Sequence, residues 1–137
     1  VLDKMISLGR IGKAKGEGFY DYPAPKSKKL WPDLATHFQS QPEALPLSTI
    51  QDRLLYSQAL ETVRILDEGV LQSTAEANLG SIMGIGFPVW TGGTLQFINQ
   101  TGLSEFVSRA EELQSQFGER FAVPESLHNR AEQQANY

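Results

Sequence analysis

A regular apolar stripe between residues 48 and 70 is the feature that most restricts how this chain can fold. Apolar side chains recur there at about every fourth residue, as one face of an α-helix requires. The members of the stripe are Ile50, Leu54, Ala59, Val63, Leu66 and Val70. Ser48-Thr49-Ile50-Gln51 matches a capping box, in which the Ser and Gln side chains satisfy free backbone groups at a helix start. The sequence therefore predicts a long helix that Gly69 stops, with one face on a core or an interface.

Two short helices are predicted after this long one. Ser73-Thr74-Ala75-Glu76 is a second capping box, and it opens a helix that ends at Gly84 or Gly86. Gly92-Gly93 breaks the chain again, and the apolar residues that follow predict another short helix that ends near Gly102.

The end of the chain predicts two more helices. Ser104 is positioned to cap a helix with apolar residues on one side, which Gly118 stops. Pro124 is suited to the first position of a last helix, because its ring fixes φ at a helical value. The chain thus predicts five or six helices without the alternation of a strand, and we expect an all-α fold.

The first 47 residues have a different character. Residues 1–8 are typical of the last turns of a helix, and Gly9 supplies a left-handed end to it, so we expect the sequence to begin within an element. A basic, glycine-rich loop follows, and Phe19-Tyr20-Asp21-Tyr22 is predicted to be extended. Residues 23–47 are rich in proline and are predicted to be a linker, interrupted only by a short helix around residues 33–38.

Composition excludes several classes of protein. The net charge of −4 lacks the basic footprint of a nucleic-acid binder, so we expect no nucleic-acid partner. The chain has no cysteine, which excludes disulfides, Cys-based metal sites and a Cys nucleophile. No apolar run approaches the ~18 residues of a membrane helix, so we expect no membrane span.

The pattern Gly-x-Gly-Phe occurs twice and raises the question of a dinucleotide site. Its copies are Gly16-Glu17-Gly18-Phe19 and Gly84-Ile85-Gly86-Phe87. Neither copy has the third glycine of the dinucleotide fingerprint, and neither lies between a strand and a helix. We expect these glycines instead to adopt backbone angles that turn Phe19 and Phe87 inward.

The remaining side chains with chemical potential do not form a catalytic pattern. His37 and His128 are not spaced as metal ligands, and Ser81 lies in a helical pattern instead of a nucleophile elbow. The acid pairs Asp67-Glu68 and Glu111-Glu112 are typical of solvated helix faces. We therefore predict no catalytic residue, no cofactor-binding residue and no metal ligand in this chain.

The basic loop is the one feature that favours a ligand. Arg10, Lys13 and Lys15 lie among flexible glycines, and such a loop can wrap an anion such as a phosphate, although a solvated loop is the commoner arrangement. Trp31 and Trp90 could mark a partner surface, and burial in the core is the alternative for both. Arg10, Lys13 and Lys15 are the predicted substrate-binding residues.

Several motifs together resemble the C-terminal domain of 3-hydroxyacyl-CoA dehydrogenases. One stretch is similar to the end of that domain: Leu8-Gly9-Arg10-Ile11-Gly12-Lys13 followed by Gly16-Glu17-Gly18-Phe19-Tyr20-Asp21-Tyr22. A second copy of the domain, as in the alpha subunit of the bacterial fatty-acid oxidation complex and its mitochondrial and peroxisomal relatives, is resembled by residues 61–70, 75–78, 83–88, 92–93 and 123–130. The resemblance implies that residues 1–22 end the first helical repeat, 23–47 link, and 48–137 form the second repeat.

The resemblance also implies what the chain does. The parent would oxidise 3-hydroxyacyl-CoA to 3-ketoacyl-CoA in fatty-acid β-oxidation, with NAD on an upstream Rossmann domain. The family's His-Glu pair and substrate-positioning Asn lie in segments outside this chain, so neither Asn78 nor Asn99 is assigned their role. The fragment would bind no cofactor and be inactive alone.

The expected partners follow from the same resemblance. They are the upstream Rossmann domain and the first helical repeat, against which the second repeat packs as a pseudo-dimer, with a homodimer and acyl-CoA as further options. A bacterial parent would be cytoplasmic, and a eukaryotic one mitochondrial or peroxisomal. The alternative from another class is an autonomous helical interaction module that binds no substrate.

Overall fold

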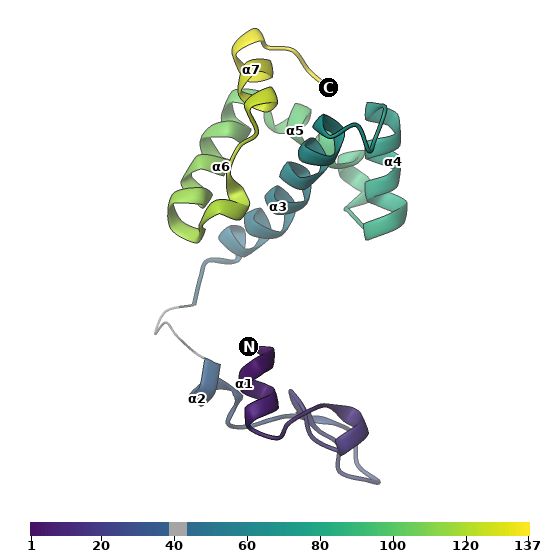
Figure 1. The fold of residues 1–137 in the computed structure, drawn as a ribbon, viewed down its shortest axis with the longest axis vertical. Helices are drawn as coiled ribbons and strands as arrows, with labels where there is room; N and C mark the ends of the chain where they lie inside the picture. Colours follow the sequence, from purple (N-terminus) through teal and green to yellow (C-terminus); the bar gives the residue numbers. More distant parts are fainter. Residues whose placement is uncertain (39–43) are drawn as a thin grey trace. The chain divides into compact units, whose positions relative to one another are not determined.

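The computed structural model describes residues 1–38 and 44–137 and divides the chain into two compact units, Val1–Ala44 and Leu45–Tyr137. The predicted all-α class is confirmed, since the described residues contain seven α-helices, of which five, α3 to α7, lie in the second unit (Figure 1). A two-stranded hairpin in the first unit is a small addition that the sequence did not predict.

The first unit is built around a loop closed by the hairpin. Helix α1 (Leu2–Ser7) ends before Gly9, whose φ of 73° confirms the predicted left-handed stop. A 3-10 turn, η1 (Lys13–Lys15), follows, and β1 (Tyr20–Asp21) pairs antiparallel with β2 (Lys29–Leu30).

Part of the predicted linker 23–47 is folded onto this loop. Strand β2 and helix α2 (Leu34–Phe38) lie within it, and α2 agrees with the short helix predicted there. The backbone amide of Trp31 donates to the carbonyl of Phe19 at 3.0 Å, and the Trp31 side chain is buried. Residues 39–43 of the predicted linker, including Pro42, lie outside the described residues.

Helix α3 (Leu47–Asp67) is the long helix that the apolar stripe predicted. The capping box predicted at Ser48 is wrong, because Pro46 is the N-cap and no side chain caps the helix start. Proline fixes its own φ near a helical value, so Pro46 leads the chain into the helix before Ser48 is reached. The predicted stop is confirmed: Gly69 has a φ of 74° directly after the helix.

The buried face of α3 covers only the middle of the predicted stripe. Ala59 and Val63 are fully buried, whereas Ile50, Leu54 and Val70 are exposed at 41%, 60% and 68%. Helix α3 packs against α5, while Ile50 and Leu54 near its start, and Val70 after its end, are left uncovered by this unit.

Helix α4 (Thr74–Ile85) has the cap that the sequence predicted. The Ser73 hydroxyl accepts the backbone amide of Glu76 at 3.2 Å, and the Glu76 carboxylate accepts the amide of Gln72 at 2.9 Å. Gly86 ends the helix in the left-handed conformation, as predicted, with a φ of 72°. The predicted Ser73 cap and helix start are therefore confirmed, while Glu76 reaches back to the amide of Gln72 instead of the Ser73 amide that a capping box uses.

The last helices have the predicted stops but not the predicted starts. A 3-10 turn, η2 (Val89–Thr91), precedes α5 (Thr94–Thr101), and α6 (Leu103–Phe117), η3 (Glu119–Phe121) and α7 (Glu125–Gln133) follow. Gly102 is the N-cap of α6, so the cap predicted at Ser104 is wrong, because the helix begins too early for Ser104 to stand outside it. Pro124 is the N-cap of α7 instead of its first residue.

The core of the second unit is centred on stacked aromatic rings. Tyr56 of α3 stacks on Phe106 of α6, with ring centroids 4.2 Å apart and planes inclined by 6°. Phe97 of α5 meets both rings edge-on, at 5.7 Å and 6.0 Å. This cluster joins three helices and buries large apolar areas, which are the main stabilising term in a domain of this size.

The two Gly-x-Gly-Phe copies have different structures. Phe87 is buried at 1% exposure, as predicted, whereas Phe19 is 37% exposed, so its predicted inward turn is wrong. Gly86 has the predicted positive φ, but Gly18 does not. Gly18 is needed for space, because a Cβ there would lie 2.8 Å from the Cα of Gly12.

Candidate functional site

Arg10, the first predicted substrate-binding residue, is the centre of the first unit. Its Nε donates to the carbonyl of Gly18 at 2.8 Å, one terminal nitrogen bonds Glu17 at 3.3 Å, and the other bonds Asp21. The guanidinium also lies 4.3 Å from the ring centroid of Trp31, as a cation–π contact. The side chain is only 9% exposed, and its geometry is that of a clamp on the loop.

Lys13 and Lys15, the other two predicted residues, lie on the η1 turn within the same loop. Both are exposed. Gly16 ends the turn with a φ of 80° and its amide bonds the carbonyl of Lys13 at 3.0 Å. The structure thus brings the three cations onto one loop, with Arg10 holding it and the two lysines facing solvent.

The two histidines have structural neighbours. His37 stacks on Trp31 with ring centroids 5.1 Å apart. His128 lies 3.8 Å from the carboxylate of Glu111. Among the described residues, no group of three His, Cys, Asp or Glu side chains is arranged to hold a metal ion.

Two residues of the motifs that carry the resemblance, Asn78 and Gly93, form the junction between α4 and α5. The Asn78 side-chain oxygen accepts the backbone amides of Leu95 and Gln96 at 3.0 Å and 3.1 Å, which satisfies free donors at the start of α5. Gly93 lies directly against Asn78, since a Cβ there would be 2.5 Å from its Cα. Asn78 and Gly93 therefore hold one helix to another.

Asn99 has a comparable structural role at the end of the chain. Its side-chain oxygen accepts the amide of Tyr137 at 3.0 Å, and its amide donates to the Tyr137 carbonyl at 3.3 Å. Arg130 lies 4.4 Å from the centroid of the Tyr137 ring. Burial raises the pKa of Tyr137 to about 12.

An ion-pair cluster closes the surface beside the aromatic core. Arg109 bonds Asp52 at 2.7 Å and Glu112 at 2.6 Å, and these hydrogen bonds, from Glu112 first, raise the pKa of Arg109. Burial, and then the Asp52 carboxylate, raise the pKa of Tyr56 to about 12. The Tyr56 ring serves the core, where it stacks on Phe106.

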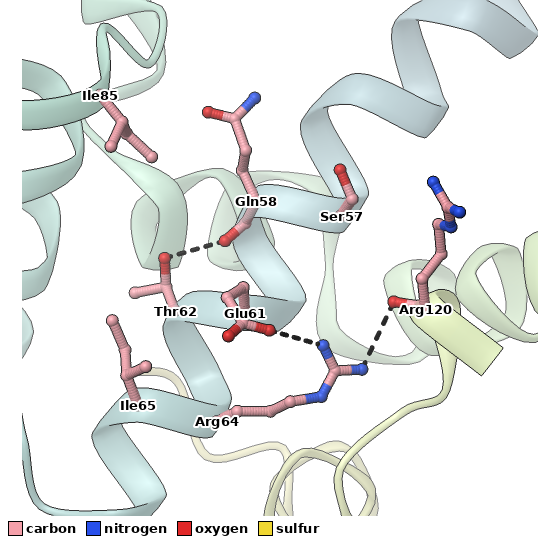
Figure 2. A pocket seen from close by; sticks show the side chains of 8 residues that line it. All are labelled: Ser57, Gln58, Glu61, Thr62, Arg64, Ile65, Ile85 and Arg120. Carbon is pink, nitrogen blue, oxygen red and sulfur yellow. Dashed lines mark hydrogen bonds and ion pairs between the residues drawn. The ribbon is translucent and has the colours of Figure 1, made fainter. Parts of the chain in front are cut away.

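A pocket of about 650 Å³ lies along α3 and is shown in Figure 2. Arg64 crosses it, bonding Glu61 at 3.0 Å and the carbonyls of Arg120 and Ala122 at 3.4 Å and 2.7 Å. The Thr62 hydroxyl is engaged within α3 itself. Arg64 thus ties α3 to the η3 turn, and the pocket's polar groups serve mainly to hold its walls.

Of the exposed apolar side chains on α4 and η2, sequence reasoning considered only Trp90 as part of a partner surface. Five large apolar side chains are strongly exposed there. They are Leu79 at 64%, Met83 at 78%, Ile85 at 60%, Val89 at 72% and Trp90 at 75%. Residues 77–104 contain no Asp, Glu, Lys, Arg or His, and this uncharged run was the signal that could have found the surface. We call Leu79, Met83, Ile85, Val89 and Trp90 the α4 surface.

The first unit also exposes apolar side chains. Leu2, Ile6 and Ile11 are exposed at 69%, 60% and 62%, and they line a pocket of about 410 Å³ beside α1. Trp31 is buried and Trp90 exposed, so the two alternatives considered for the tryptophans each apply to one of them. Within the described parts of the chain, no helix is both long and apolar enough to cross a membrane.

Comparison with known proteins finds relatives that match nearly the whole chain. It is 35% identical over 132 residues to the fatty acid oxidation complex subunit alpha of Vibrio parahaemolyticus, covering 96% of this chain. It is 34% identical over 138 residues to that of Vibrio campbellii and 31% over 137 residues to that of Shewanella oneidensis. No protein-family model matches the chain.

The chain is therefore homologous along its length to one segment of these bacterial subunits, which confirms the predicted relationship to them. It spans about a fifth of the length of the curated relatives it matches, 19% of the Vibrio parahaemolyticus subunit.

Proposed function

We propose that this chain is the C-terminal helical part of an NAD-dependent 3-hydroxyacyl-CoA dehydrogenase within a fatty-acid oxidation subunit. Residues 1–22 close the first helical repeat, 23–47 link, and 48–137 form the second repeat. The parent, a bacterial cytoplasmic protein, oxidises 3-hydroxyacyl-CoA to 3-ketoacyl-CoA with NAD on its upstream Rossmann domain. This part supplies packing surfaces and has no catalytic centre of its own.

The α4 surface is the observation that carries this proposal. Met83 is 78% exposed and Trp90 is 75% exposed. No charged side chain occurs between residues 77 and 104. Apolar patches rimmed by polar groups mark interaction sites, and aromatic residues and Met are enriched in the buried centre of interfaces. A role in packing against another repeat, or against a second copy, accounts for this exposure.

The first unit supports the same role. Among the described residues of Val1–Ala44, Leu2, Ile6 and Ile11 are exposed, and the buried apolar side chains are only Met5 and Trp31. Such a small core stabilises a unit poorly, because little apolar area is removed from water. Contacts with an upstream repeat would supply the missing cover.

The motif residues support a structural role for the second unit. Asn78 caps α5, Gly93 makes room for that cap, and Asn99 holds the end of the chain. The side-chain amides of Asn78 and Asn99 have partners that explain them without a substrate. A packing domain needs these joints, whereas a catalytic domain would also need a base and a binding cleft.

Acyl-CoA binding is the finer part of the proposal and rests on the basic loop. Lys13 and Lys15 are exposed and available to phosphate groups, while Arg10 is engaged in holding the loop. Substitution of either lysine should therefore weaken acyl-CoA binding by removing a direct contact. Substitution of Arg10 should weaken it by changing the conformation of the loop.

The experiment is light scattering of the purified chain over a concentration series, with calorimetric titration of acetoacetyl-CoA and NAD. We expect self-association that the double variant Met83→Ser/Trp90→Ser abolishes. The control Val70→Ser, at an apolar residue that is 68% exposed and lies outside the α4 surface, should retain it. A monomer at every concentration, or reduction of NAD by the chain with 3-hydroxybutyryl-CoA, would contradict the proposal.

The alternative is an autonomous helical interaction module, which the α4 surface favours as well. The two functions differ in substrate binding. Acetoacetyl-CoA affinity that falls in Lys13→Gln/Lys15→Gln supports the dehydrogenase role, whereas association without any such affinity supports the module.

A further inference from the structure

A second, smaller pocket lies on the outer side of α3, where the helix meets the η3 turn. Its volume is about 270 Å³, and it shares Ser57 and Arg120 with the larger pocket of Figure 2. Its lining is Ile50, Arg53, Leu54, Ser57, Arg120 and Phe121. Two arginines and two exposed aliphatic side chains are thus gathered in one hollow, and neither the packing surfaces nor the basic loop uses them.

Arg120 presents its guanidinium to this hollow from a fixed backbone. Arg64 bonds the Arg120 and Ala122 carbonyls at 3.4 Å and 2.7 Å, which ties the η3 turn to α3. Figure 2 shows the Arg120 side chain extending away from Arg64. The Arg120 guanidinium has no ion-pair or hydrogen-bond partner among the residues that the structure describes, so its planar array of donors is available to an oxyanion.

Arg53 is the second cation, and it is held by an aromatic ring. Its guanidinium carbon lies 4.3 Å from the centroid of Phe117, and its Nε is buried without a hydrogen-bond partner among the described residues. Stacking fixes the plane of the group without using its donors. Arg53 is half-buried as a whole, and a guanidinium with a buried donor that lacks a partner gains from an added acceptor.

The acids close to these arginines are already engaged elsewhere. Asp52, next to Arg53 in the sequence, bonds Arg109 at 2.7 Å, and Glu61 bonds Arg64 at 3.0 Å. Arg109 also bonds Glu112, and Glu119, next to Arg120, accepts a hydrogen bond from the neutral Gln114, so these acids keep part of their charge. The lining of the hollow itself holds two arginines and no acid, which gives it a locally positive character. Ile50 and Leu54, exposed at 41% and 60%, lie one helical turn apart on its wall.

We propose that this hollow binds an amphiphilic oxyanion, a carboxylate or phosphate on a short alkyl chain. The oxyanion accepts hydrogen bonds from Arg53 and Arg120, and the alkyl chain covers Ile50 and Leu54. Charge-assisted hydrogen bonds fix the head, and burial of aliphatic surface supplies the rest of the affinity.

The test is titration of the full 137-residue chain, labelled with ¹⁵N, with octanoate, octyl phosphate, inorganic phosphate and octanol. We expect saturable shifts at Leu54, Ser57 and Arg120 with octanoate or octyl phosphate, and about tenfold or greater weakening for phosphate alone and for octanol. The tighter of the two alkyl anions identifies the preferred head group.

Three variants separate the contributions. Arg120→Gln should weaken both alkyl anions by about tenfold, since it removes one charged donor group. Leu54→Gln should weaken the alkyl anions and leave inorganic phosphate unchanged, and Lys26→Gln, which removes an exposed cation in the first unit, should change neither. Equal binding of octanoate by Arg120→Gln and the unaltered chain, or shifts that never saturate, would overturn the proposal.

Discussion

Each of the two units of this chain is stabilised internally by a different kind of interaction. The first, Val1–Ala44, is organised around one cation, Arg10, which bonds a backbone carbonyl and two carboxylates and stacks on Trp31. The second, Leu45–Tyr137, is organised around a continuous apolar core in which the Tyr56 and Phe106 rings stack. A polar clamp fixes the path of a loop, whereas an apolar core supplies most of the free energy of folding.

This difference predicts unequal stability in the two units. The described part of the first unit buries two large apolar side chains, Met5 and Trp31. The second unit buries a cluster of apolar side chains that several helices contribute. Each unit contains one tryptophan, Trp31 or Trp90, so a Trp90→Phe background lets fluorescence report on the first unit alone. Far-UV circular dichroism then follows mainly the second unit, which holds the long helices.

The largest expected effect is in the apolar core. Phe106→Ala should lower the free energy of unfolding of the second unit by about 3–5 kcal/mol, because it leaves a cavity against Tyr56 and Phe97. Urea denaturation followed by circular dichroism measures this change. Trp31 emission should be unaffected by the substitution, and a common shift of both signals would mean that the units unfold as one.

A second test concerns the joint between α4 and α5. Gly93→Ala should destabilise the second unit by about 2–3 kcal/mol, because φ is 113° and the new Cβ would lie 2.5 Å from the Asn78 Cα. The matched control is Gly80→Ala in α4, where a Cβ meets nothing within 4 Å. That control should be neutral or stabilise by about 0.5–1 kcal/mol, and equal effects of the two substitutions would refute the explanation.

Removing the Arg10 clamp of the first unit should cause a smaller loss of stability. Arg10→Gln should cost about 1–2 kcal/mol, a value reduced by the solvent exposure of Glu17 and Asp21. In the Trp90→Phe background, Trp31 emission should shift to longer wavelength while the second unit unfolds as before. Lys13→Gln makes the same change in charge at an exposed residue and should leave Trp31 emission as it was.

The smallest expected effect is at the two predicted capping boxes, which are compared by one substitution in each. Ser73→Ala should destabilise the second unit by about 1 kcal/mol, because it removes the acceptor of the Glu76 amide. Ser48→Ala should change stability by less than about 0.5 kcal/mol, because Ser48 lies inside α3 and does not cap it. A loss at Ser48 as large as that at Ser73 would show that the first box forms in solution.

The sequence determined the features that depend on a few neighbouring residues. The cap at Ser73 and the stops at Gly69, Gly86 and Gly118 are where the sequence predicted them, and the all-α class follows from such signals. A cap or a left-handed stop joins atoms within about one helical turn, so local residue types suffice to predict it. Where two local signals competed, at Pro46 and Ser48, the predicted N-cap was two residues too late.

Tertiary structure decided which residues face one another across the chain. Asn78 caps a helix 17 residues away, and Arg64 bonds a carbonyl 58 residues away. The exposure of Met83 and Trp90, and the hollow between Arg53 and Arg120, likewise depend on which helix faces are covered. A periodic pattern identifies an apolar face but not its cover, because burial is set by the packing of distant segments.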